Sequence, residues 1–137
     1  MTNPSLSPEL LYTSLAALFT GVMWIPIVLN RLREVGIWPA LQNPQPDARA
    51  RAAWAHRLAN AHRNAIENLV VFAPLAIAVH ALGLGNAQTA AAAAIFFFAR
   101  VAHAVIYAAG IPVLRTIAFT FGFICQVVLA ARVLGWL

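Results

Sequence analysis

Four long, mostly apolar segments constrain the fold of this chain more than any other feature of the sequence. They cover residues 10–29, 56–82, 87–109 and 113–136. A helix rises 1.5 Å per residue, so about twenty residues cross a hydrocarbon layer roughly 30 Å thick. We therefore predict an all-α integral membrane protein, a four-helix bundle that forms one domain over residues 1–137.

The composition argues against the alternative of a soluble, fully buried bundle. Of 137 residues, 62% are hydrophobic and only 9% are charged, whereas soluble domains have about 45–50% apolar and about 25% charged residues. A soluble domain of this size has too little interior to bury so much apolar surface. A lipid bilayer is therefore the expected partner of most of the chain.

The basic residues indicate membrane orientation rather than nucleic-acid binding. All nine are Arg, and they do not form a basic run interleaved with aromatic residues. Most lie in the loop after the first segment and at the start of the second. Because basic residues accumulate on the cytoplasmic side, the Arg-rich loop is predicted to be cytoplasmic and both termini to lie outside.

Proline and glycine residues predict where the helices bend or end. Pro26 is expected to kink the last turn of the first span, and Pro74 lies within the second helix. Residues 31–51 are predicted to be a loop or an amphipathic stretch, with the helical pattern resuming around Ala48. The single cysteine, Cys125, lies in an apolar run and is expected to be a packed, inert thiol.

Polar residues recur at helical spacing inside three of the segments. In the second, Arg57, Asn60, Asn64 and Glu67 form one stripe, with His56 and Arg63 beside it. In the third, Arg100, His103 and Tyr107 lie on one face, and Arg115 occupies the first turn of the fourth. With the predicted topology, all three helices place these residues towards the same side of the membrane.

This convergence favours a binding or catalytic site over a set of structural ion pairs. An ionisable group within a span costs about 2.5–3.5 kcal/mol on insertion scales, so it usually faces a partner or a wet cavity. Pairing Glu67 with Arg63 or Arg100 would leave several cations unpaired. The excess of guanidinium groups therefore predicts an anionic ligand. The histidines have no recognised metal-ligand spacing, so no metal is expected.

At these same residues the chain resembles the MAPEG family, the membrane-associated proteins in eicosanoid and glutathione metabolism. The run from Arg57 to Asn68, followed by Phe72, resembles its second-helix signature. The run from Ala99 to Tyr107, followed by Arg115-Thr116, resembles its third- and fourth-helix motifs. The likeness, closest to bacterial-type members of the inner cell membrane, covers most of the chain.

The resemblance implies a homotrimer that binds glutathione as co-substrate between neighbouring subunits. Arg115 would stabilise the glutathione thiolate, with Thr116 as a possible hydrogen-bond donor. Arg31 and His62 would reach the site from the adjacent subunit. Asn60 stands where many members have Arg, and Phe119 where some have Tyr. The remaining residues that would line the tripeptide site are Asn60, Arg63, Asn64, Glu67, Arg100, His103 and Tyr107.

Three functions remain open at this stage. The resemblance favours a glutathione-dependent transferase or peroxidase that acts on hydrophobic electrophiles or lipid hydroperoxides. A non-catalytic protein that binds an anionic metabolite or a lipid headgroup is the alternative. A transporter or channel fits less well, because the spans show no paired halves and the polar residues lie towards one side only.

Overall fold

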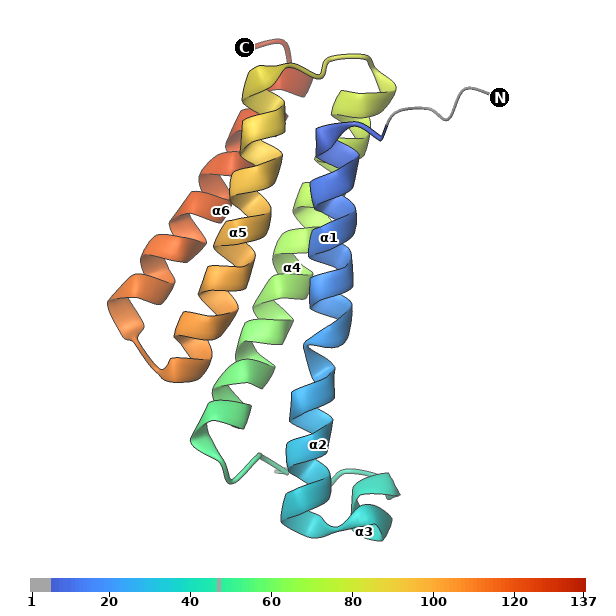
Figure 1. The fold of residues 1–137 in the computed structure, drawn as a ribbon, viewed down its shortest axis with the longest axis vertical. Helices are drawn as coiled ribbons and strands as arrows, with labels where there is room; N and C mark the ends of the chain where they lie inside the picture. The colour runs from blue at the N-terminus through green and yellow to red at the C-terminus, as the bar shows by residue number, and fades with distance from the viewer. Residues whose placement is uncertain (1–5, 47) are drawn as a thin grey trace.

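A computed structural model describes residues 6–46 and 48–137, and the regular structure of these residues is helical throughout. The elements run antiparallel along one long bundle (Figure 1). Their bounds are α1 Pro8–Val22, α2 Trp24–Val35, α3 Ile37–Leu41, α4 Ala53–Ala81, α5 Ala87–Ala109 and α6 Pro112–Val133.

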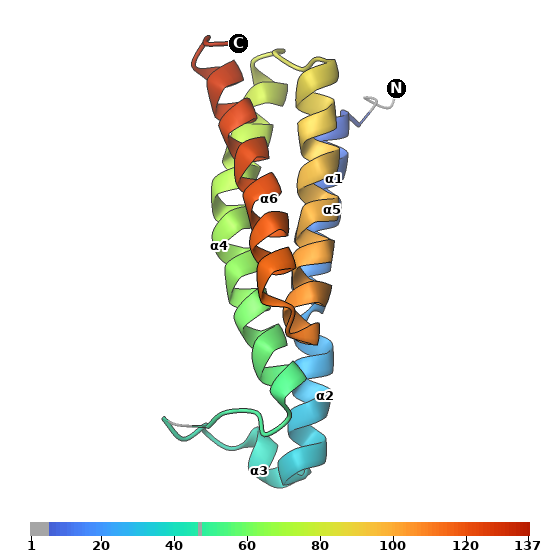
Figure 2. The same ribbon diagram turned by 90° about the vertical axis from the view of Figure 1, so that its left-hand side faces the viewer.

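Four stretches of these described residues are long and apolar enough to cross a membrane: Pro8–Val35, Ala53–Ala81, Ala87–Ala109 and Pro112–Val133. The all-helical, multi-pass membrane architecture predicted from the sequence is therefore confirmed. Helices α1 and α6 lie on opposite sides of the bundle, and each contacts both α4 and α5. Figures 1 and 2 place the start of α1 and the end of α6 at one end, and α3 and the α5–α6 turn towards the other.

The first transmembrane segment is longer than its apolar run and is interrupted in the middle. The helix breaks at Met23, between α1 and α2, and then continues to Val35. Pro26 explains the position of the break, because its ring has no N–H and would clash with the carbonyl group of Val22 four residues earlier. Pro26 therefore interrupts the first span as expected, but in the middle of the helix rather than in its last turn, because the helix continues to Val35. Arg31 and Arg33, predicted in the loop, continue the helix instead.

Helix α4 begins later than the predicted resumption around Ala48, and a side chain of α2 binds the connection that leads into it. The Glu34 carboxylate accepts hydrogen bonds from the backbone N–H groups of Arg51, at 3.1 Å, and Ala52, at 2.9 Å. A carboxylate at a helix N-terminus also interacts favourably with the helix dipole. The expected helical residues 48–52 therefore form a connection, and the helix begins at Ala53.

Glycine determines where α6 ends. Gly135 adopts a left-handed conformation with φ of 73°, and the Trp136 N–H donates to the Ala131 carbonyl at 2.8 Å. This pairing is the Schellman motif, which closes a helix at a glycine. Helix α6 thus stops at Val133, three residues before the end of the predicted segment at 136.

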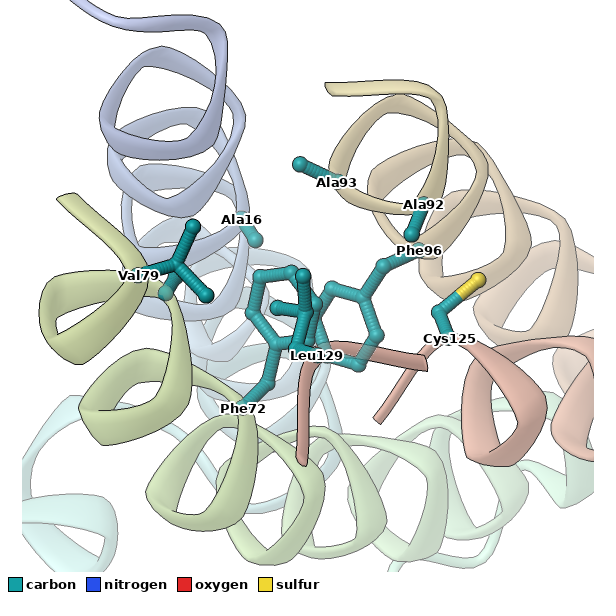
Figure 3. Packing of buried hydrophobic residues seen from close by; sticks show 9 residues of the cluster. Ala16, Phe72, Val79, Ala92, Ala93, Phe96, Cys125 and Leu129 are labelled. Carbon is teal, nitrogen blue, oxygen red and sulfur yellow. The ribbon is translucent and has the colours of Figure 1, made fainter. Parts of the chain in front are cut away.

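The bulky part of the core lies in the half of the bundle nearest the termini. Phe72 of α4 and Phe96 of α5 are fully buried and stack with ring centroids 3.7 Å apart. Val79, Leu129 and the single cysteine, Cys125, pack in the same cluster (Figure 3). Many of the other buried residues are alanines, which allow helices in lipid to approach closely.

Candidate functional site

The sequence-predicted polar residues of α4, α5 and α6 meet in the half of the bundle nearest the α5–α6 turn. The centre of this group is Arg100, whose side chain is only 3% exposed. Its guanidinium group donates to Asn64 Oδ1 of α4 at 3.1 Å and to the Ala118 carbonyl of α6 at 3.2 Å. One side chain of α5 therefore connects three helices at one depth.

A glycine makes room for the Arg100 guanidinium group. A Cβ atom built on Gly122 of α6 would lie 2.7 Å from Arg100 Nη2, closer than real Cβ contacts allow. Two aromatic rings also lie near the cation, those of Phe96 at 5.8 Å and Phe119 at 5.6 Å from Arg100 Cζ. This role of Gly122 was not predictable from the sequence, because a glycine within an apolar span has many packing explanations.

Among residues 6–46 and 48–137, no carboxylate is bonded to Arg100 to balance its positive charge. Its hydrogen-bond partners are an amide and backbone carbonyl groups, and its buried Nε has no partner within the described part of the chain. Glu9 instead accepts from Thr89 at 2.6 Å, and Glu34 caps α4. Glu67 is exposed. The ion pairs considered from the sequence therefore do not account for Arg100.

Arg115 lies on the more open side of the same region. The side chain is half-buried, and its guanidinium carbon lies 4.5 Å from the centre of the Tyr107 ring. His103, which is buried, packs edge-on against the same Tyr107 ring, with 5.5 Å between the two ring centroids. This cation–π contact holds a second guanidinium group near Arg100 while leaving it accessible.

We refer to Asn64, Arg100, His103, Tyr107 and Arg115 as the polar cluster. Asn60, Arg63 and Glu67 extend it along the outer face of α4, where Arg63 and Glu67 are exposed and Asn60 is half-buried. Thr116, beside the cluster on α6, is exposed, and its hydroxyl group donates to the Pro112 carbonyl at 3.2 Å. Its hydrogen is thus held by its own helix.

Arg31 and His62 lie apart from the polar cluster. His62 follows Asn60 by two positions and precedes Asn64 by two, and each such step rotates about 200° around a helix. The half-buried His62 therefore projects from a different side of α4 than Asn60 and Asn64. Arg31, also half-buried, is on α2, which contacts α4. His62 thus faces another side of α4 than Asn60 and Asn64, and Arg31 belongs to α2, which contributes no residue to the polar cluster.

Two buried amides that the sequence reasoning missed extend the polar cluster deeper into the bundle. Gln126 of α6 donates through Nε2 to Asn68 Oδ1 of α4 at 3.1 Å, and both side chains are more than nine-tenths buried. The sequence did contain a signal for Gln126, because it is an amide in the middle of an apolar segment. No group of three or more His, Cys, Asp or Glu residues suited to a metal ion occurs within residues 6–46 and 48–137.

These features define a class of protein, a multi-pass helical membrane protein with cationic and amide groups clustered within one half of the bundle. The model of the MAPEG family matches residues 10–135, which is nearly the whole chain, and this protein belongs to the MAPEG family. The family includes glutathione-dependent transferases and peroxidases. Comparison with curated proteins and with solved structures gave no match.

Proposed function

We propose that this protein is a glutathione-dependent transferase or peroxidase that acts on hydrophobic electrophiles or lipid hydroperoxides. The observation that carries the proposal is the unbalanced positive charge of the polar cluster. Arg100 is buried among neutral partners, and the half-buried Arg115 lies over the Tyr107 ring. A cationic group held in a low-dielectric environment favours an anionic ligand.

Glutathione has the charges that this arrangement requires. It carries two carboxylates, one ammonium group and a thiol. We propose that Arg63 binds a carboxylate and that Glu67, on the same exposed side of α4, holds the ammonium group. Tyr107, which packs against His103, provides the ring over which the Arg115 guanidinium group lies.

Arg115 is the residue proposed to activate the thiol. A cation next to sulfur stabilises the thiolate, which is the nucleophilic form, and so increases its fraction near neutral pH. The thiol proton passes to water, the thiolate forms a bond to the electrophilic carbon, and the leaving group departs with its electron pair. With a hydroperoxide, the thiolate attacks oxygen as the O–O bond breaks, and a second glutathione yields the disulfide, an alcohol and water.

The hydrophobic co-substrate would reach the thiolate from the bilayer. Helix α6 has a surface hollow that begins at Thr116, the residue after Arg115. The hollow is lined by Thr116, Ile117, Thr120, Phe121 and Ile124. Its lining is almost entirely apolar apart from two threonines. A molecule dissolved in lipid would therefore meet no aqueous barrier before reaching this edge of the site.

We further propose that the chain forms a homotrimer whose interfaces complete the site. Arg31 and His62 lie apart from the polar cluster within one subunit, so the partner subunit would supply them. The Arg-rich end, with the polar cluster, would face the cytoplasm, in keeping with the distribution of Arg residues. Cytoplasmic glutathione would then enter at this end.

The test is an equilibrium titration of the purified protein in detergent with glutathione, followed by calorimetry and by thiolate ultraviolet absorbance. We expect saturable binding accompanied by a thiolate signal at neutral pH. Binding without thiolate would favour the non-catalytic alternative, and no binding would overturn the proposal. Glu67→Ala should weaken binding, whereas Gln88→Ala, a polar truncation at the opposite end of the bundle, should not.

A further inference from the structure

The amides of Asn64, Asn68 and Gln126 form a closed hydrogen-bond path with Arg100, which we call the three-helix network. Gln126 Nε2 donates to Asn68 Oδ1 at 3.1 Å and to the Asn68 carbonyl at 3.3 Å. Asn68 Nδ2 in turn donates to the Asn64 carbonyl at 2.8 Å and to Asn64 Oδ1 at 3.3 Å. Arg100 donates to the same Asn64 oxygen and to the Ala118 carbonyl, two turns before Gln126 on α6.

The network fixes which atom of Asn64 is available to a ligand. The side-chain oxygen of Asn64 already accepts from Asn68 Nδ2 and from Arg100 Nη1. An amide oxygen has two lone pairs, so both acceptor positions are used. The assignment of O and N in an asparagine follows from such a network. The half-buried Asn64 therefore presents its NH₂ group, a donor, towards the open side.

We infer that Asn68 and Gln126 are positioning residues that orient Asn64 to donate a hydrogen bond to an anionic group of the bound ligand. The inference rests on the proposed function and deepens it, because it assigns Asn64 to a ligand carboxylate rather than to the ammonium group. Neither Asn68 nor Gln126 reaches the open side, since both are buried. They act through the amide that does.

The direction of every bond in the network supports this reading over a purely structural one. Gln126 donates to Asn68, Asn68 donates to Asn64, and Arg100 also donates to Asn64. Three N–H donors are thus accepted by two amide oxygens, those of Asn68 and Asn64. The buried Gln126 therefore sets the direction of the hydrogen bonds along the network. An Asn64 amide turned the other way would direct its NH₂ group at the Arg100 guanidinium group and lose both bonds.

The test compares Gln126→Met with Thr89→Val by glutathione calorimetry in detergent. Gln126→Met removes two buried hydrogen bonds between α6 and α4. Thr89→Val removes a buried bond between α5 and Glu9 of α1, together with the bonds to Asn86 at the start of α5, and all of these lie at the opposite end of the bundle. We expect Gln126→Met to raise the glutathione Kd about three- to tenfold, and Thr89→Val to leave it unchanged. The thiolate signal per bound glutathione should stay constant in both variants. Equal effects of the two substitutions would overturn the inference.

A double-mutant cycle with Asn64→Ala separates positioning from general stability. If Gln126 acts through Asn64, Gln126→Met should have no further effect on the Kd once Asn64 is alanine. Additive effects would contradict the inference. Asn68→Leu provides a second variant if Gln126→Met folds poorly, with the same expected result. If the wild-type protein binds no glutathione, the proposed function is contradicted, and the inference fails with it.

Discussion

The two halves of this bundle differ in how completely the hydrogen-bonding groups of their polar side chains are partnered. Near the termini, the Glu9 carboxylate accepts from the Thr89 hydroxyl group, and Arg132 donates to the Leu84 carbonyl at 2.9 Å. Each of these groups joins two elements around a bulky apolar core. In the other half, Arg100 keeps an unpartnered Nε, and Arg115 is held only over an aromatic ring. The half near the termini therefore has its polar groups paired across elements, and the other half is the one in which we propose that a ligand binds.

The largest expected effect is on the apolar half, through Phe96→Ala. Phe96 is fully buried against Phe72, and truncating a buried Phe costs about 3–5 kcal/mol in soluble cores. We expect a loss near the lower limit, because lipid is itself apolar and removes part of the transfer term. Denaturant unfolding in detergent measures the change. Phe98→Ala, on the same helix but 60% exposed, is the matched control and should cost little.

Arg115→Ala should produce the next largest effect, on chemistry rather than on stability. Loss of a group that stabilises developing negative charge commonly lowers kcat about 100-fold or more. The thiolate absorbance of bound glutathione should disappear, while the unfolding transition moves little. Arg132→Ala removes the same side chain from the other end of α6 and should leave the thiolate intact. A thiolate signal that survives Arg115→Ala would show that another group activates the sulfur.

Gly122→Ala should affect both properties to a moderate degree. The added methyl group would collide with the Arg100 guanidinium group, and overpacking of this kind costs about 1–3 kcal/mol. We expect weaker glutathione binding together with lower thermal stability in detergent. Gly21→Ala is the control, because a Cβ atom there meets nothing within 4 Å. Unchanged behaviour of Gly122→Ala would mean that Arg100 rearranges at no cost.

Tyr107 provides the smallest and sharpest comparison. If the ring face positions Arg115, Tyr107→Phe should retain nearly full activity, because the ring remains. Tyr107→Leu should lose about 0.5–1 kcal/mol, which is about two- to fivefold in kcat/KM. Steady-state kinetics with a hydrophobic electrophile measures the difference. A strong effect of Tyr107→Phe would instead assign the role to the hydroxyl group.

The sequence predicted the membrane fold well because lipid imposes a simple physical rule. Four segments of about twenty residues had to be helical to satisfy their backbone hydrogen bonds, and four such helices are found. The ends of the helices were less predictable. The charges of Arg31 and Arg33 end the apolar run of the first span, but the helix continues through both residues. The start of α4 follows a connection that is bound by Glu34, a residue 17 positions earlier in the sequence.

The candidate site was predictable at the level of periodicity and not at the level of contacts. Helical spacing correctly placed Arg100, His103 and Tyr107 on one face of α5, and these residues pack near Asn64 and Arg115. The binding roles of these residues stay predictions. Spacing within one helix says nothing about the partner on another. The pairing of Gln126 with Asn68 depends on how α6 packs against α4, which only the structure supplies.

The burial of Cys125 has a practical consequence for mapping the assembly. It is the only cysteine in the sequence and is enclosed in the apolar core, so a reagent in the aqueous phase would find almost no native thiol. In a variant with one cysteine introduced at an accessible position, a thiol reagent would therefore react almost entirely with that cysteine. Thiol cross-linking between one copy carrying Arg31→Cys and another carrying Glu67→Cys could then show which surfaces of two subunits meet.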